Sequence, residues 1–301
     1  MTAATGAPVI IEVALNGMTT RDRNPNVPQT PEEIAACALR CIDGGASVIH
    51  THNSSMTLPP DEAAEQYAES WHPILDARPE ALVYPTQCLA PTMAEKMAHV
   101  EPLVDKAGLR IGLVDPGSVN MTWADADGLP AAEGHAYVNT VAEIRWAFAE
   151  CDRLQLGPSV SIYEPTWLNH TLAFHRAGKL PRGAMVKLYF GGPYGYFARG
   201  HGVSFGLPPT EKAVDAYAEM LDGAGLPWSV SALGGDIVAT PAARHALELG
   251  GHLKVGLEDH ASERTPSNEA LVAEAVALAA EAGRPVASCG EAALILDLPR
   301  R

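Results

Sequence analysis

The stretch TPEEIAACALRCIDGGASVIHTH at 30–52 contains one complete helix–turn–strand unit, which is the repeating unit of the predicted fold. Thr30 followed three residues later by Glu33 is the signature of a capped helix start. Gly44 falls where that helix is expected to end. The apolar run at 47–52 is rich in β-branched residues and is typical of a buried strand.

Short apolar strands and alanine-rich helices of this kind alternate along the whole chain. Strands are expected at 9–15, 47–52, 82–84, 110–114, 159–163, 185–190, 228–232 and 253–257. Helices are expected near 31–44, 60–77, 92–106, 140–154, 166–178, 210–224, 240–250 and 268–283. This alternation predicts an α/β fold, a (β/α)₈ TIM barrel that forms a single domain over residues 1–301, with a C-terminal helical extension. A doubly wound open sheet is the alternative.

The composition and the charge exclude several classes of protein. Lys and Arg number 21 against 36 Asp and Glu, so the formal net charge is −15. Such a surface repels nucleic acid and anionic membranes, and an anionic substrate needs a locally positive site. Five cysteines without a CxxC pair indicate reduced thiols, not a disulfide framework or a cysteine zinc site. The N-terminus shows no export or anchoring signal, so a cytoplasmic location is expected.

Two stretches lack a regular pattern, 115–139 and 191–209. The second, GGPYGYFARGHGVSFGLPP, is rich in glycine and aromatic residues and follows the sixth expected strand. We interpret it as an active-site loop or lid, with a long surface loop as the alternative.

The first chemical signal is VIHTH at the end of the second expected strand. Because residues i and i+2 of a strand share a face, His50 and His52 project together. The carboxyl ends of barrel strands form the active-site face, so the two imidazoles are candidate metal ligands. The alternative is that they only hydrogen-bond to neighbouring loops.

A second signal is LKVGLEDH at 253–260, the eighth strand and its exit. Strand alternation turns Lys254 and Glu258 toward the barrel interior, where each charge needs a partner. In a closed barrel the second and eighth strands both flank the first, which brings Glu258 within reach of the two histidines. His50, His52 and Glu258 would then form an open His₂Glu metal site. The alternative is an ion pair between Lys254 and Glu258 without a metal.

Other charged residues have several possible roles. Asp259 directly follows the candidate ligand and is a candidate general base, or it only caps a turn. Lys254 could pair with Asp259, with a substrate carboxylate, or with Glu12 on the first strand. Arg21 and Arg199, in the loops after the first and sixth strands, could bind an anionic substrate or a CoA phosphate, although most loop arginines are solvated.

Weaker substrate-binding candidates follow three other strands. Thr86 follows the third strand, and Asp115, Gly117 and Ser118 follow the fourth. Their hydroxyls and backbone N–H groups could bind a carboxylate, but ordinary turn formation explains the second group equally well. Glu164, after the fifth strand, is a further candidate.

Five segments together carry a resemblance to a known family. They are VALNGMTTRDRNPNVPQTPEEIA (13–35), GGASVIHTH (44–52), PSVSIYEPT (158–166), GGHLKVGLEDH (250–260) and ALVAEAVALAAEAGRPVAS (270–288). In these segments the chain resembles the β-keto acid cleavage enzymes, a family that includes 3-keto-5-aminohexanoate cleavage enzyme. The resemblance covers nearly the whole chain, with both candidate metal-binding segments in the expected order.

The resemblance implies a zinc-dependent (β/α)₈ barrel, usually a homotetramer. Such an enzyme converts a β-keto acid and acetyl-CoA into acetoacetate and a new acyl-CoA. The resemblance also implies zinc, or another divalent transition metal, at His50, His52 and Glu258. Asp259 would act as the base, with Lys254 as its partner.

The chain matches the family at Thr86, where relatives have a hydroxyl that contacts the substrate, and departs from it elsewhere. Lys254 stands where the family usually has Arg, so the bidentate fork is lost and a looser pair is expected. Met18 stands near the position of an acid that binds the ammonium group of an amino-keto acid, so a cationic substrate is not expected. Leu113 and Asp115 replace a threonine and an asparagine, which indicates a remodelled substrate pocket.

Two other functions stay open beside acyl-CoA-dependent cleavage. One is a metal-dependent aldolase or hydrolase on the same barrel that uses no CoA, which an absence of CoA binding would favour. The other is a metal-binding barrel without turnover that serves in ligand binding or assembly, supported only by Leu113 and Lys254.

Overall fold

The structure is a computed structural model that describes residues 6–195, 202 and 205–300. Eight parallel strands form one sheet in the order β3-β2-β1-β10-β9-β8-β7-β4. Every strand pairs with a neighbour along the chain, and the first pairs with the last, which is the order of a barrel and not of a doubly wound sheet. The strands are β1 (Ile11–Ala14), β2 (Val48–Thr51), β3 (Val83–Pro85), β4 (Ile111–Val114), β7 (Gly157–Ile162), β8 (Met185–Gly191), β9 (Trp228–Leu233) and β10 (His252–Val255).

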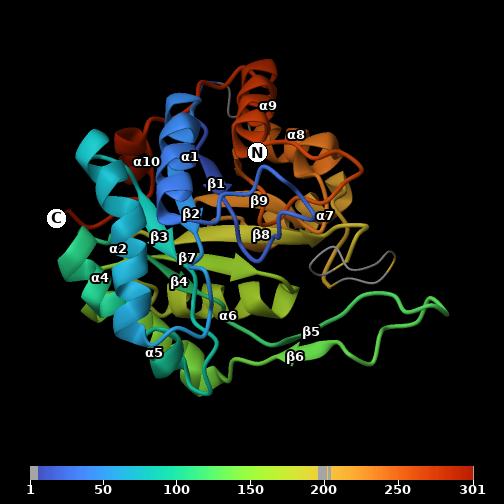
Figure 1. Cartoon of the computed structure of the whole chain (residues 1–301). Helices are drawn as coiled ribbons and strands as arrows, with labels where there is room; N and C mark the ends of the chain where they lie inside the picture. The colour runs from blue at the N-terminus through green and yellow to red at the C-terminus, as the bar shows by residue number, and fades with distance from the viewer. Residues whose placement is uncertain (1–5, 196–201, 203–204, 301) are drawn as a thin grey trace.

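The sheet is nearly closed, and helices surround it (Figure 1). Its two end strands, β3 and β4, contact each other, and Gln87 Nε2 donates a 3.2 Å hydrogen bond to Leu113 O across this seam. The helices are α1 (Pro31–Asp43), α2 (Pro60–Ala77), α3 (Met93–Lys96), α4 (Val100–Ala107), α5 (Val141–Arg153), α6 (Pro165–Arg176), α7 (Glu211–Leu221), the 3₁₀ helix η2 (Ile237–Ala239), α8 (Pro241–Glu248), α9 (Asn268–Glu281) and α10 (Cys289–Ile295). The predicted α/β barrel fold is therefore confirmed. Within the described residues, no helix combines the length and apolar composition needed to cross a membrane.

The helix start predicted at the head of α1 has the expected chemistry. Thr30 Oγ1 accepts a hydrogen bond from Glu33 N, and the Glu33 carboxylate accepts one from Thr30 N. Ile34, Ala38 and Cys41 then fall on the buried face of α1. The opposite face of the helix is turned toward solvent. The apolar core lies between this ring of helices and the strands.

Two predicted boundaries are wrong for reasons of backbone chemistry. The helix expected at 92–106 is interrupted between α3 and α4. Pro102 explains the break, because its ring would clash with the carbonyl four residues earlier in a continuous helix. The strand expected at 253–257 ends at Val255, because Gly256 adopts a φ of 127° and turns the chain.

One expected irregular stretch contains regular structure. Within 115–139, strands β5 (Val119–Met121) and β6 (His135–Tyr137) form an antiparallel hairpin. This hairpin extends away from the barrel as a long arm (Figure 1). The lid predicted at 191–209 lies partly outside the described residues and stays a prediction.

Candidate active site

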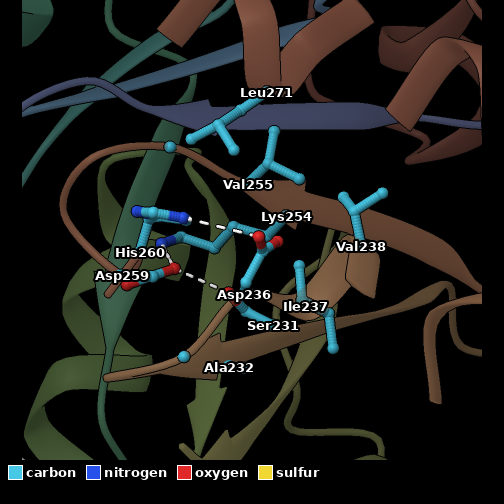
Figure 2. A pocket seen from close by; sticks show the side chains of 12 residues that line it. Ser231, Ala232, Asp236, Ile237, Val238, Lys254, Val255, Asp259, His260 and Leu271 are labelled. Atoms are coloured by element: carbon cyan, nitrogen blue, oxygen red, sulfur yellow. Dashed lines mark hydrogen bonds and ion pairs between the residues drawn. The ribbon is translucent and has the colours of Figure 1, made fainter. Parts of the chain in front are cut away.

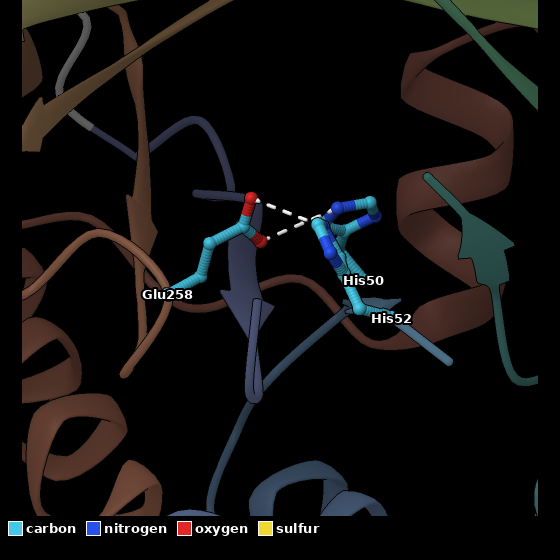
Figure 3. Close-up of side chains that lie close together, drawn as sticks. All are labelled: His50, His52 and Glu258. Carbon is cyan, nitrogen blue, oxygen red and sulfur yellow. Dashed lines mark ion pairs between the residues drawn. The ribbon is translucent and has the colours of Figure 1, made fainter. Parts of the chain in front are cut away.

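Two histidines on and after β2 meet one glutamate that follows β10 (Figure 3). His50 Nε2 lies 3.3 Å from Glu258 Oε2, and His52 Nε2 lies 3.3 Å from Glu258 Oε1. The three possible ligand atoms lie within 4.8 Å of one another. The strand order explains the cluster, because β1 pairs with β2 on one side and with β10 on the other.

The cluster has the chemistry of a metal site. Among the described residues, His50 Nδ1, both ring nitrogens of His52 and Glu258 Oε2 are buried without a hydrogen-bond partner. Burial lowers the pKa of His50 well below its usual value, which favours the neutral imidazole that binds metal. Burial would raise the pKa of Glu258, but the charge of Lys254 opposes burial, and the pKa lies well below its usual value. Two imidazoles and a carboxylate suit a catalytic zinc ion with an open coordination position, and other divalent metals as well.

Neighbouring residues fix the positions of the three candidate ligands. Asn16 Nδ2 donates to His52 O at 3.0 Å, and Asn16 Oδ1 accepts from His52 N at 2.9 Å. The ring of Tyr84 lies 4.4 Å from the ring of His50. Gly17 has a φ of 52°, and a Cβ there would lie 2.4 Å from Glu258 Cγ. The loop after β1 can therefore approach Glu258 only because residue 17 is glycine.

Beside this cluster lies a buried ion pair (Figure 2). Lys254 Nζ donates to Asp259 Oδ2, and Ser231 Oγ donates to the same oxygen at 2.6 Å. Burial would lower the pKa of Lys254, but the carboxylates of Asp259 and Glu258 raise it. Burial raises the pKa of Asp259, which Lys254 opposes. Of the partners considered for Lys254, Asp259 is the one that its ammonium group contacts.

Glu12, the other candidate partner, belongs to a different buried network. Tyr84 OH donates to Glu12 Oε1 at 2.5 Å, and Lys187 Nζ donates to Tyr84 OH at 2.9 Å. Lys187 Nζ also lies 3.7 Å from Glu12 Oε1, with both side chains almost fully buried. The charge of Glu12 is thus compensated by Lys187.

A cavity of about 240 Å³ opens beside the candidate metal ligands His52 and Glu258. Its lining residues are Met18, His52, Met56, Thr86, Gln87, Cys88, Leu89, Lys96, Asp115, Met121, His135, Tyr137, Tyr163, Leu233 and Glu258. The structure therefore brings two of the predicted substrate-binding residues, Thr86 and Asp115, to the same cavity as two candidate ligands. Asp259 lines a separate cavity of about 10 Å³ together with Lys254 and Ser231 (Figure 2).

Three predicted substrate-binding residues make contacts away from the 240 Å³ cavity. Gly117 packs against Trp167, where an added Cβ would lie 2.1 Å from the indole ring. Ser118 Oγ donates to Asn139 O at 3.1 Å, which anchors the loop. Glu164 Oε1 accepts from Gly206 N at 2.9 Å. Their substrate roles stay predictions.

Of the two predicted CoA-binding arginines, Arg21 lies within the described residues. Arg21 is exposed, and its Nη2 lies 2.6 Å from Glu33 Oε1. Arg199 lies outside the described residues.

Sequence reasoning missed four residues of this region. Lys187 interrupts an apolar strand, MVKLYF, and the argument used for Lys254 would have found it. Ser231, a small polar residue on β9, gave no signal of its own. Lys96 and Tyr137 also gave none, because one lies on an expected helix and the other in a stretch expected to be irregular.

Comparisons with known proteins agree on a family. The family described as beta-keto acid cleavage enzyme matches residues 8–298. The 3-oxoadipate:acetyl-CoA acetyltransferase of Cupriavidus necator is 26% identical over 97% of this chain and 95% of that protein. The 3-keto-5-aminohexanoate cleavage enzyme of Acetoanaerobium sticklandii is 27% identical over 97% of this chain and 99% of that protein.

Solved structures show the same fold at low sequence identity. The ternary complex of ObcA with C4-CoA adduct and oxalate has a TM-score of 0.64 at 14% identity, covering 91% of this chain and 68% of that chain. A 3-dehydroquinate dehydratase from Geobacillus kaustophilus HTA426 has a TM-score of 0.51 at 12% identity, covering 93% of this chain and 99% of that chain. Since the family match spans almost the entire sequence, the chain belongs to the β-keto acid cleavage enzyme family.

Proposed function

We propose that this enzyme cleaves a β-keto acid with acetyl-CoA and releases acetoacetate and a new acyl-CoA. The observation that carries the proposal is the open cluster of His50, His52 and Glu258 next to the buried Lys254–Asp259 pair, in a chain of this family. The three cluster residues would hold a zinc ion. When bound, zinc would polarise the carbonyl oxygen of the substrate as a Lewis acid.

We propose Asp259 as the general base. Lys254 and Ser231 both donate to Oδ2, so the orientation of the carboxylate is fixed. Oδ1 has no hydrogen-bond partner among the described residues and is the atom that would accept the proton from C2 of the keto acid. Thr86 lines the neighbouring cavity and would orient the substrate through its hydroxyl.

The reaction balances with acetyl-CoA as the only co-substrate. After C2 loses its proton, it bonds to the acetyl carbon, and the CoA thiolate leaves. The thiolate then attacks the original keto carbon, and the bond between C2 and that carbon breaks. C2 recovers the proton held at Asp259, which gives acetoacetate, and the remaining acyl group leaves on CoA.

A reaction between a keto acid and a CoA thioester needs two approaches to one centre, and a neighbouring cavity supports this part of the proposal. A cavity of about 480 Å³ shares Met18, His52, Met56 and Leu89 with the 240 Å³ cavity. Hydroxyl and amide side chains line much of it: Asn16, Thr19, Thr20, Gln29, Asn53, Ser54, Ser55 and Thr57. We propose that it binds the pantetheine arm of CoA, whose amides and hydroxyl match these groups.

The predicted role of Arg21 is consistent with this path. A further cavity of about 300 Å³ shares Pro28 with the 480 Å³ cavity and is lined by both Arg21 and Arg40. Each guanidinium is exposed and pairs with one carboxylate, Glu33 or Glu269, so N–H groups stay available for phosphate. We propose that this cavity receives the phosphates of CoA. The proposed role of Arg199 is not tested by the described residues.

One edge of the 240 Å³ cavity lacks a partner for a cationic substrate group among the described residues. Met18, about half exposed, lines it at the loop after β1. A thioether offers no charge to an ammonium group. We therefore propose a keto acid other than a cationic amino-keto acid, and a homotetramer from family resemblance alone.

Acetoacetate release tests the reaction class directly. Zinc-loaded enzyme would be mixed with acetyl-CoA and a panel of neutral, anionic and cationic β-keto acids. We expect acetoacetate and acyl-CoA in equal amounts, only when both metal and CoA ester are present. Zinc-loaded enzyme that releases acetoacetate from no member of the panel would contradict the proposal and favour a lyase or hydrolase that does not use CoA.

A further inference from the structure

The wall of the 240 Å³ cavity contains a buried lysine that the mechanism does not use. Lys96 is only 9% exposed, at the end of α3. Its Nζ donates to Asn139 Oδ1 at 2.8 Å and to Val138 O at 3.3 Å, and it lies 5.6 Å from the centre of the Tyr137 ring. Both acceptors are neutral. An ammonium group has three N–H donors, so one donor stays available to a ligand. Two carboxylates, Asp115 and Glu143, also lie within range of its charge.

Lys96 borders the part of the cavity wall that the β5–β6 hairpin forms, because its Nζ lies beside Tyr137 and bonds to Asn139 just after β6. Its hydrogen-bond partners follow β6 in the chain, and β6 pairs with β5 after the barrel strand β4. The candidate metal ligands belong to β2 and to the exit of β10, which lie on the other side of β3 in the strand order. A substrate that reacts at the metal would therefore extend its far end toward Lys96.

Asp115 is the residue that could reverse this charge preference, since it lines the same cavity. Its Oδ2 accepts a 2.6 Å hydrogen bond from Tyr137 OH, so part of its acceptor capacity is used inside the protein. Burial raises the pKa of Asp115, which reduces its tendency to carry a negative charge. Tyr137 thus occupies one oxygen of Asp115, whereas Lys96 keeps one N–H donor on the cavity wall that no described residue accepts.

We propose that Lys96 binds a carboxylate at the distal end of the substrate, so that the preferred substrates are β-keto dicarboxylic acids. This inference rests on the proposed function, because it assigns the substrate class of the same site. It also explains how a chain of net charge −15 can attract a dianion, since the positive charge is local.

The test compares two keto acids that differ only at the far end. 3-Oxoadipate ends in a carboxylate, and 3-oxohexanoate ends in a methyl group. We expect Lys96→Met to lower the ratio of kcat/KM for 3-oxoadipate to kcat/KM for 3-oxohexanoate by about 10- to 100-fold, the range of a hydrogen bond to a charged group. Lys96→Arg keeps the charge and should restore most of the ratio. Lys106→Met removes an exposed lysine that pairs with Glu65 and should leave the ratio unchanged.

The outcomes separate this proposal from a structural role and from failure of the reaction. If Lys96→Met lowers kcat/KM equally for both acids, Lys96 only anchors the hairpin or binds the carboxylate common to both, and the proposal is wrong. If no keto acid reacts, calorimetric binding of adipate and hexanoate to the zinc-loaded protein decides it. An adipate preference that Lys96→Met abolishes supports the site, and equal binding of both acids by the wild type overturns it.

Discussion

The contribution of the Lys254–Asp259 pair to the free energy of unfolding can be measured without any substrate. Lys254 is fully buried and Asp259 is 3% exposed. Lys254 and Ser231 both donate a hydrogen bond to Asp259 Oδ2. Replacing Lys254 by Met removes the first of these donors and keeps the second. Removing one partner of a buried ion pair costs about 3–5 kcal/mol, because the other charge stays buried without compensation. We therefore expect Lys254→Met to lose about 3–5 kcal/mol of unfolding free energy, a large share of the usual total of about 5–15 kcal/mol.

A double-mutant cycle identifies the partner of Lys254. Urea unfolding of the metal-free protein would be measured for Lys254→Met, Asp259→Asn and the double variant. We expect a coupling energy of about 2–3 kcal/mol, because the two side chains touch. The matched cycle combines Lys254→Met with Glu12→Gln. Since Glu12 is paired with Lys187 and Tyr84, its coupling to Lys254 should stay below about 1 kcal/mol.

Two results would refute this reasoning. A loss below about 1 kcal/mol in Lys254→Met would mean that the pair is hydrated or unimportant for folding. A larger coupling energy with Glu12 than with Asp259 would instead identify Lys254 as the counter-ion of Glu12 on β1.

Three further predictions concern the metal site, the base and the acid stability. His50→Ala and Glu258→Gln should each lose bound metal, and stoichiometric zinc in either variant by elemental analysis would contradict the ligand assignment. Asp259→Asn should keep its metal and lower kcat by about 10²–10⁴-fold, the usual contribution of a general base, so near-normal turnover would exclude that role. His252 Nδ1 accepts a 3.0 Å hydrogen bond from Ile10 N, and burial lowers its pKa from 6.5 to about 3. The unfolded chain therefore binds this proton first, stability falls as the pH drops from about 6.5 toward 3, and the loss at pH 5 is about 2 kcal/mol. The free energy of unfolding in urea would be measured at pH 8 and pH 5 for the wild type and for His252→Gln. The loss between the two pH values should be about 2 kcal/mol smaller in the variant. An equal loss in both proteins would show that His252 is not the cause.

The fold could be predicted from the sequence because its signals are local. Capped helix starts and apolar strands repeat in one order, and a parallel sheet of such units closes into a barrel. The errors occur where one residue overrides a longer pattern. Pro102 breaks a helix that the periodicity extends through it, and Gly256 ends a strand that the alternation continues. The hairpin of β5 and β6 was missed because three-residue strands are too short for a pattern to be seen.

The candidate metal cluster could be predicted because strand order fixes it. His50 and His52 belong to β2 and Glu258 follows β10, and both strands must flank β1 in a barrel. Lys96 could not be predicted in the same way. It reaches the cavity from a short helix outside the barrel and is held by Asn139, beyond the hairpin, so its place depends on loop geometry that no strand order fixes.

The lysine at position 254 fits the proposed mechanism better than its sequence context indicates. The family usually has arginine at this position, and its guanidinium could bond to both oxygens of Asp259. The ammonium group of a lysine cannot bond in this forked way, so a looser pair is expected. The structure adds a second donor, since Ser231 Oγ bonds to the same Oδ2 that Lys254 contacts. Two donors on one oxygen fix the carboxylate and leave Oδ1 without a hydrogen bond among the described residues, which is the arrangement a base needs to accept a proton. Ser231→Ala should therefore weaken turnover more than metal binding, and a loss of zinc in that variant would show that Ser231 supports the cluster instead.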